Sequence, residues 1–369
     1  MHTYFFSSLS GYIHFLLENT IMHFHLLPFV IECLSKDKSS LHSCIQVNRL
    51  WCRTAIPVLW SDPFRYVTED KENFPEIIFI YLGSLEKSAK QKFLSKIPDD
   101  KKSLFKTPTF DYVKFLKHFN YWMVVGTIKE AARTLNFQLF YFNDDNPLEG
   151  TIKTHILNLI YVRSLRLDQL TIADHYGLGH FLGEKDYKPF KRVRNGNFLK
   201  QIKKLSFCIN YPSLYKIFSW MPDHCPNVKH LKFRLKTFHD SDSSTITNVL
   251  SKFNDIRTFK LRIHYRGYKD EEILPSIANN IHSLTTIVFC NCNLKNNKNL
   301  IQEITQCKGL IELKFLLCTG LTIDKANLLI NANFPMLKSV ELWGDDYCDE
   351  IVNWGKSISP QFYDDPEDA

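Results

Sequence analysis

The chain has 369 residues, of which 44% are hydrophobic and 23% are charged, and its formal net charge is +7. A chain of this length is too long for one ordinary compact domain, although a repeat array could extend that far as one body. We expect one small domain and one large one. The composition excludes disordered and fibrous classes, and the mildly basic charge does not by itself indicate a nucleic-acid binder.

Residues 1–25 form an N-terminal extension before the first recognisable element. Residues 1–21 are apolar, but they lack a Lys or Arg ahead of the apolar run, and Ser, Gly and His interrupt it. A signal peptide is therefore not favoured. No run in the chain reaches the roughly 18 to 20 apolar residues of a membrane-spanning helix. Met22 is an alternative start of the protein.

The cysteine pattern indicates a reducing compartment. Ten cysteines are scattered along the chain without a CxxC pair, and no Asn-x-Ser/Thr sequon occurs. Scattered thiols within apolar segments are typical of reduced core residues. We expect a cytoplasmic and/or nuclear protein.

Three short helices are predicted between residues 26 and 60. Pro28 suits the first turn of the first helix, Ser39 is a candidate N-cap for the second, and Asn48 is one for the third. Their apolar stripes are Ile31 and Leu34; Leu41, Cys44 and Ile45; and Trp51, Cys52, Ala55 and Ile56. Helices this short are marginal alone, so they must pack on something.

Residues 65–155 are expected to form a helical connector, since EIIFIYLGSL and FDYVKFLKHF carry apolar residues at helical spacing. From about residue 156 a six-residue pattern recurs, apolar-x-x-apolar-x-apolar. From residue 202 its start-to-start spacings are 26, 28, 28, 26 and 27, and the first interval is 40. The predicted strands are VRSLRL (162–167), IKKLSF (202–207), VKHLKF (228–233), IRTFKL (256–261), LTTIVF (284–289), LIELKF (310–315) and LKSVEL (337–342).

Helix-like segments lie between these strands, at 243–253, 270–281 and 299–307. A strand plus a helix every 26–28 residues predicts an α/β solenoid, and the period resembles that of ribonuclease-inhibitor-like leucine-rich repeats, which form a curved array. We expect the repeats to span 156–346, with a C-terminal cap and an acidic tail at 347–369.

Three positions strengthen this resemblance. Three residues past the last apolar strand position, where leucine-rich repeats favour Asn or Cys, the chain has Asn210, Cys292 and Cys318. Other repeats depart from the pattern with Lys236, His264 and Asp345, so an irregular array is expected.

The segment at residues 26–60 resembles an F-box, for which we take the bounds 26–64. Leu27-Pro28 opens it, VNRLW (47–51) marks its third helix, and Leu59-Trp60 closes it. Members of this family dock on the Skp-type adaptor of a cullin-RING, SCF-type ubiquitin ligase, and a second domain, often leucine-rich repeats, holds the substrate. One departure is Val30, where many F-boxes have an acidic residue. The resemblance implies the adaptor-facing residues Leu27, Pro28, Ile31, Leu34, Leu41, Val47, Trp51 and Trp60.

In an alternative interpretation, the segment is a helical cap on the repeat array, and its two tryptophans, Trp51 and Trp60, are ordinary core residues of that cap. The physical argument for a partner is that three short helices present more apolar surface than they can bury among themselves.

Strand alternation predicts the composition of the concave face, because neighbours of the inward apolar positions point outward. These neighbours are mainly cationic: Lys204, His230, Lys232, Arg234, Lys260, Arg262 and Lys314. Only Asp168, Glu312 and Glu341 oppose them, towards the ends of the array, and Tyr265 and Trp343 are candidate aromatic anchors. We expect this face to bind a protein substrate, with an acidic or phosphorylated segment as the hypothesis and a solvated charged face as the alternative.

Other chemistry has weaker support. Cys290, Cys292, Cys307 and His282 are the one cluster worth testing for zinc, and GLGHFLG (177–183) departs from a glycine-rich phosphate loop. The basic stretch 188–204 is an alternative nucleic-acid contact, which we do not favour. Common hydrolase, metalloprotease and P-loop motifs do not occur.

The sequence thus predicts a non-catalytic substrate-recognition subunit without a cofactor. Its partners are expected to be a Skp-type adaptor, through it a cullin, and a protein substrate, without a membrane. The alternative is a ligase-independent repeat scaffold for protein–protein interaction.

Overall fold

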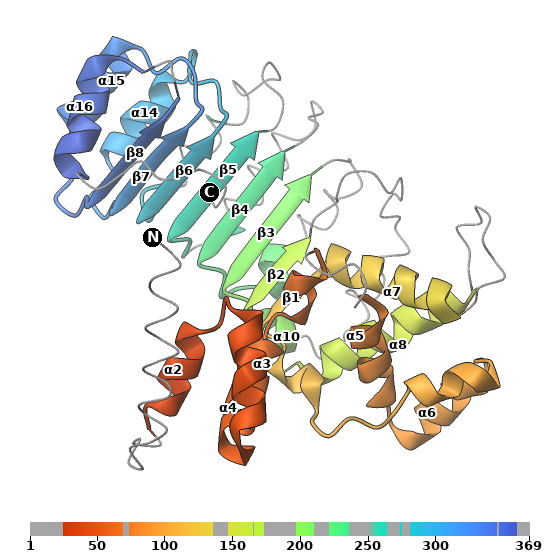
Figure 1. Cartoon of the computed structure of the whole chain (residues 1–369). Coiled ribbons are helices and arrows are strands. Elements are labelled where there is room, and N and C mark those ends of the chain that lie inside the picture. The colour runs from red at the N-terminus through yellow and green to blue at the C-terminus, as the bar shows by residue number, and fades with distance from the viewer. Residues whose placement is uncertain are drawn as a thin grey trace.

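The computed structural model describes residues 25–68, 74–135, 147–164, 166–172, 197–209, 221–235, 252–253, 255–263, 274, 281–344 and 347–359. In these residues one parallel sheet carries eight strands in chain order, each beside the one before it (Figure 1). The strands are β1 (His118–Asn120), β2 (Gln169–Ile172), β3 (Lys204–Ile209), β4 (His230–Leu235), β5 (Thr258–Ile263), β6 (Thr286–Cys290), β7 (Glu312–Leu316) and β8 (Ser339–Trp343). This α/β arrangement is consistent with the predicted solenoid.

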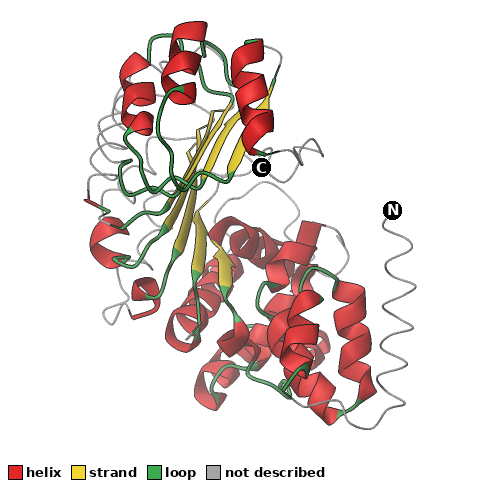
Figure 2. Ribbon diagram, turned by 90° about the vertical axis from the view of Figure 1, so that its left-hand side faces the viewer, coloured by secondary structure: helices red, strands yellow, loops and turns green. Residues whose placement is uncertain are grey.

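Most of the helices that the structure describes lie near one or the other end of the sheet (Figures 1 and 2). At the β1 end lie α2 (Leu27–Cys33), α3 (Lys38–Val47), α4 (Arg49–Leu59), α5 (Phe74–Gly83), α6 (Lys87–Leu94), α7 (Tyr121–Leu135) and α8 (Pro147–Arg163). At the β8 end lie α14 (Lys298–Thr305), α15 (Ile323–Ile330) and α16 (Asp349–Ile358). The short helix α10 (Asn197–Lys200) precedes β3, and short 3₁₀ helices occupy Pro63–Thr68, Asp99–Leu104 and Tyr112–Phe115.

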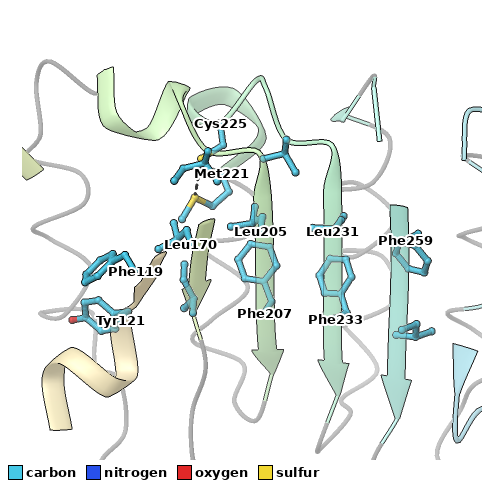
Figure 3. Close-up of a cluster of buried hydrophobic side chains, with 14 of the residues drawn as sticks. Phe119, Tyr121, Leu170, Leu205, Phe207, Met221, Cys225, Leu231, Phe233 and Phe259 are labelled. Carbon is cyan, nitrogen blue, oxygen red and sulfur yellow. Dashed lines mark hydrogen bonds between the residues drawn. The ribbon is translucent and has the colours of Figure 1, made fainter. Parts of the chain in front are cut away.

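Phenylalanine rings form the spine of the main core. Phe207 and Phe233 on neighbouring strands stack with their centroids 5.5 Å apart, as Figure 3 shows, and Phe289 and Phe315 stack at 5.9 Å. All four are completely buried, and the same core takes in the apolar stripes of α14, α15 and α16. The large share of phenylalanine in the chain therefore has a structural use, because one buried ring on each strand from β3 to β7 fills the space between sheet and helices.

A recurring backbone hydrogen bond links each repeat to the next. The carbonyl of the residue before each of the strands from β1 to β7 accepts from two N–H groups at the start of the following strand; Lys229 O, for example, accepts from Arg257 N at 2.8 Å and Thr258 N at 3.0 Å. The series begins outside the sheet, where Ser61 O accepts from Lys117 N and His118 N. The segment that follows α4 thus continues the geometry of the repeats.

Two sequence predictions about the start of the sheet are corrected. VRSLRL (162–167) was expected to be the first strand, but α8 extends to Arg163, and the matching pattern is LDQLTI (167–172), which contains β2. The sheet also begins earlier, since β1 lies within the segment expected to be a helical connector and pairs with β2 through Phe119 and Leu170. The pattern of apolar residues around β1 uses Tyr121 at its last position, which made it harder to recognise.

Several predicted features lie wholly or mostly outside the described residues. They are the helices at 243–253 and 270–281, the glycine-rich segment 177–183, most of the basic stretch 188–204, and Asn210, Lys236, His264, Tyr265 and Asp345. The helix expected at 299–307 is confirmed as α14.

Helices α2, α3 and α4 form a small unit with a core of its own, which we call the three-helix unit. Pro28 occupies the first turn of α2, as predicted, and Asn48 Oδ1 caps α4 by accepting from Leu50 N at 2.9 Å and Trp51 N at 3.1 Å. The N-cap of α3 is Asp37, which accepts from Ser40 N at 3.1 Å; the prediction of Ser39 was wrong. A carboxylate at this position is stabilised by the partial positive charge of the helix N-terminus. The hydrogen bonds that Ser40 donates to the carboxylate lower the pKa of Asp37.

Across the residues that the structure describes, we find no helix long and apolar enough to cross a bilayer.

Candidate functional site

The face of the sheet opposite α14 and α15 carries the predicted cationic residues, and we call it the open face. On β4 the buried residues are Leu231, Phe233 and Leu235, so the alternate residues of the strand point to the open face. Strand register then places Lys232 beside Lys260 and Arg234 beside Arg262. Neighbouring strands are about 4.8 Å apart, so these four side chains form a compact square of positive charge, the cationic block.

The cationic block has no neutralising partner in the described part of the chain. None of its four side chains lies within 4.0 Å of a described carboxylate. Burial, together with the charges of Arg234, Lys260 and Arg262, lowers the pKa of Lys232 to about 8. The buried Nε of Arg234 also has no hydrogen-bond partner among the described residues. An anion that entered this site would relieve the repulsion and supply the missing acceptor.

Two more of the predicted residues, Lys204 and His230, continue the open face towards β3. Lys204 is exposed, and it is the register partner of His230. Burial, then the charges of Lys204, Arg257 and Lys229, lowers the pKa of His230. The sequence-based expectation of a cationic centre is therefore met geometrically at Lys204 and the four residues of the cationic block, whereas the lowered pKa of His230 favours its neutral form.

Lys314 on β7 differs from the other predicted cations. Its Nζ lies 3.0 Å from Glu312 Oε1 and 2.7 Å from Glu341 Oε2. Burial would lower the pKa of Lys314, but the hydrogen bonds with Glu341 and Glu312 outweigh it and raise that pKa. The prediction that Lys314 belongs to a substrate-binding cationic surface is corrected, because two carboxylates neutralise it. The positive surface ends at β5, since β6 carries Val288 and Cys290 on this face.

An apolar strip separates the cationic block from β8 on the open face. Val288, Cys290 and Leu316 pack together in a small cluster of their own. Cys290 is the register partner of Arg262, and Leu316 is the partner of Trp343, whose side chain is 38% exposed. Along the open face the chain therefore presents cations on β4 and β5 and then the apolar side chains of Val288 and Cys290 on β6. Leu316 on β7 and the ring of Trp343 on β8 follow, beside the ion pairs of Lys314 with Glu312 and Glu341.

The four residues considered for zinc do not converge. Cys290 belongs to the open-face strip, whereas Cys292 and Cys307 lie in the main core, and His282 Nε2 faces Glu303 at 3.4 Å. No set of three or more His, Cys, Asp or Glu side chains within the described ranges is arranged to hold a metal ion. Cys318, in the matching turn of the next repeat, instead donates to the carbonyl of Phe289.

The predicted adaptor-facing residues divide into a buried and an exposed set. The buried set fills the core of the three-helix unit and comprises Leu27, Ile31, Leu34, Leu41 and Trp51. The expectation that these five face outward is corrected, because three helices of this length suffice to enclose them. Pro28 and Val47 are exposed.

Trp60 has a different position from both sets. Its ring centroid is 4.1 Å from that of Tyr112 and 6.0 Å from that of Tyr81, so it packs between the three-helix unit and the main core. His118 adds a polar contact at the same junction, with Nδ1 3.2 Å from Asp62 Oδ2 and Nε2 3.7 Å from Asp168 Oδ1. The unit is therefore held firmly at the β1 end of the sheet.

The outward apolar surface of the three-helix unit includes residues that the sequence reasoning missed. Phe29 is 71% exposed, and Leu26 and Leu50 are also exposed. The sequence could have indicated this exposure. At helical spacing, Leu27, Ile31 and Leu34 share the buried face of α2, whereas Phe29 points in another direction. Leu26, Pro28 and Phe29 lie at the start of α2, and Val47 and Leu50 flank the α3–α4 junction.

No protein-family model matches the chain, and comparisons with curated proteins and with solved structures yield no significant match.

Proposed function

We propose that the chain is the substrate-recognition subunit of an SCF-type cullin-RING ubiquitin ligase. Residues 26–64 act as an F-box that docks on a Skp-type adaptor and through it on a cullin. The leucine-rich repeats hold a protein substrate by an acidic or phosphorylated segment on the open face. The chain itself positions the substrate for transfer that other subunits catalyse, in the cytoplasm or nucleus, where thiols such as its ten disulfide-free cysteines stay reduced.

One observation carries the proposal. The three-helix unit encloses a complete core yet leaves Leu26, Pro28, Phe29, Val47 and Leu50 outside it. A unit that only capped the end of the sheet would gain nothing from these apolar side chains, whose exposure costs about 25 cal/mol per Å² relative to burial. A partner that covers them recovers this free energy, and exposed apolar side chains in a group mark protein interaction surfaces.

The firm junction at Trp60 supports the same role. A receptor must hold its substrate at a fixed place relative to the adaptor, and the Ser61 carbonyl joins the unit to the first strand through two hydrogen bonds. Docking through a rigid scaffold preserves such positioning better than a loose linker.

Co-expression with a Skp-type adaptor tests the proposal. We expect the native chain to retain the adaptor in a pull-down and a Phe29→Ser, Leu50→Ser variant to lose it. Because both side chains are exposed, this variant keeps its core, unlike changes at Trp51 or Leu27. The matched control is Leu104→Ser, Val162→Ser, which removes two exposed apolar side chains elsewhere.

Failure of the native chain to retain the adaptor would refute the ligase role. The alternative, a ligase-independent scaffold, would then apply, and it predicts normal solubility without any adaptor.

A further inference from the structure

The order of features on the open face matches the order of features in the last ten residues of the sequence. From β8 towards β4 one row of the face presents Trp343, then Leu316 and Cys290 of the apolar strip, then the cationic block. The row beside it presents Glu341, Lys314 and Val288, and there Lys314 neutralises the carboxylates of Glu312 and Glu341. Residues 360–369, which lie outside the described part of the chain, read PQFYDDPEDA. Two aromatic residues come first, and four carboxylates follow within the next five residues.

The point where this segment leaves the described structure fixes its starting place. Ser359 Oγ accepts a hydrogen bond from Val340 N at 2.8 Å, which places Ser359 against β8. From β8 the apolar strip is one to two strand spacings away, and the cationic block lies about 14 to 19 Å away. Ten extended residues span about 33 Å, so the segment can reach the block.

We propose that residues 360–369 dock across the open face of their own chain, with Phe362 and Tyr363 against the apolar strip and the acidic residues on the cationic block. As a consequence the segment competes in cis with acidic substrates. This consequence rests on the proposed function, whereas the docking does not.

Charge complementarity favours docking of residues 360–369 on the open face over a face that contacts only solvent. The four cations of the block have no carboxylate partner in the described ranges, and Asp364, Asp365, Glu367 and Asp368 supply four. Charge-assisted hydrogen bonds between guanidinium and carboxylate groups are the strongest of the ordinary kinds. A short tether also gives the segment an effective concentration of about a millimolar, so even weak docking occupies the site.

The test compares two full-length chains: the native one and a neutral-tail variant, Asp364→Asn, Asp365→Asn, Glu367→Gln, Asp368→Asn. The probe is a fluorescent synthetic peptide with the sequence of residues 360–369, followed by anisotropy. We expect the peptide to bind the neutral-tail chain at least tenfold more tightly than the native chain, because the native segment already occupies the block.

Two further variants locate the binding site. Lys260→Gln, Arg262→Gln in the neutral-tail chain should abolish peptide binding. Lys298→Gln, Lys356→Gln, which removes the same charge from exposed positions on α14 and α16, should leave it unchanged. Equal binding of the peptide to the native and neutral-tail chains, or binding to neither, would overturn the proposal.

A second probe separates this proposal from the proposed function. The second probe is a peptide of alternating glycine and phosphoserine. If it binds the native and neutral-tail chains equally through the cationic block, tail docking is refuted, while substrate binding at the open face remains supported. Tail-peptide binding to the neutral-tail chain combined with no adaptor binding refutes the ligase role and leaves tail docking standing.

Discussion

Lys232 on β4 and Lys260 on β5 are register partners on neighbouring parallel strands, and both point to the open face of the sheet. Two ammonium groups side by side repel each other, and Arg234 and Arg262, the next pair along the same strands, add to the repulsion. The low pKa of Lys232, about 8, results from burial and these neighbouring charges. A bound anion would offset this repulsion between the clustered cations.

Anion binding at the open face should weaken as pH rises through about 8. Lys232 loses its proton there. The groups that face it are Arg234, Lys260, Arg262 and Cys290, and burial raises the pKa of the Cys290 thiol. Sulfate is a suitable probe because its charge is constant over this range. Titration of the neutral-tail chain with sulfate at pH 7 and pH 9 should show weaker binding at pH 9, and Lys232→Gln in the same chain should bind weakly at both.

The same group makes a prediction about stability. Its folded-state pKa lies below the ordinary value of Lys, so between pH 8 and about 10.4 the unfolded chain holds more protons than the folded one. Without ligand, the free energy of unfolding of the neutral-tail chain should therefore rise across this window relative to that of the same chain carrying Lys232→Gln. Parallel pH profiles for the two chains, by urea denaturation, would show that Lys232 is not strained by charge.

Removing one ring of the phenylalanine spine should be costly. Phe233 is completely buried and contacts Phe207 at 5.5 Å and Phe259 at 6.1 Å between ring centroids. Phe233→Ala should lower the free energy of unfolding by about 3–5 kcal/mol, since it removes a large side chain and leaves a cavity. Chemical denaturation measures this value, and the exposed Phe29→Ala, with an expected change within about 0.5 kcal/mol, is the control.

A buried lysine should act as a structural tie at the β8 end. Lys325 is only 5% exposed, and its Nζ donates to the carbonyls of Leu294 at 2.7 Å, Lys295 at 2.5 Å and Gly320 at 2.9 Å. Lys325→Met keeps the length of the side chain but leaves these acceptors unpaired, so a loss of at least about 1–3 kcal/mol is expected. A melting temperature equal to that of the exposed control Lys356→Met would show that the tie is dispensable.

Trp60 should couple the unfolding of the three-helix unit to that of the sheet. The ring packs on Tyr112 and Tyr81, where the two cores meet. Trp60→Ala should weaken the junction by about 2 kcal/mol and split a single thermal transition into two. Calorimetry that still shows one transition, at a temperature lowered by the same amount throughout, would argue against this coupling.

The sequence predicted the repeating strands from β3 to β8 and the cations on their open face, because a period of 26–28 residues and strict alternation determine both. The sequence pattern did not locate β1 and β2. Tyr121 ends the first apolar pattern, and the strong match at VRSLRL lies in α8 and its immediate continuation. Short patterns cannot distinguish a helix end from a strand when the apolar spacing fits both.

Pairing between side chains was also beyond the sequence. Lys314 was grouped with the other cations, yet strand register places it between Glu312 and Glu341. Likewise, nothing in a list of apolar residues distinguishes Trp51, enclosed by three helices, from the exposed Phe29. Burial at these positions depends on how the helices cross, which periodicity alone does not specify.

The central claim is that one chain bridges a Skp-type adaptor and an acidic segment. The most direct measurement immobilises the alternating glycine–phosphoserine peptide and asks whether purified adaptor is retained only in the presence of the neutral-tail chain. The account predicts retention, lost equally when Lys260→Gln, Arg262→Gln or Phe29→Ser, Leu50→Ser is added. Adaptor and peptide that each bind the chain but exclude one another, or an adaptor that never binds it, would contradict the account.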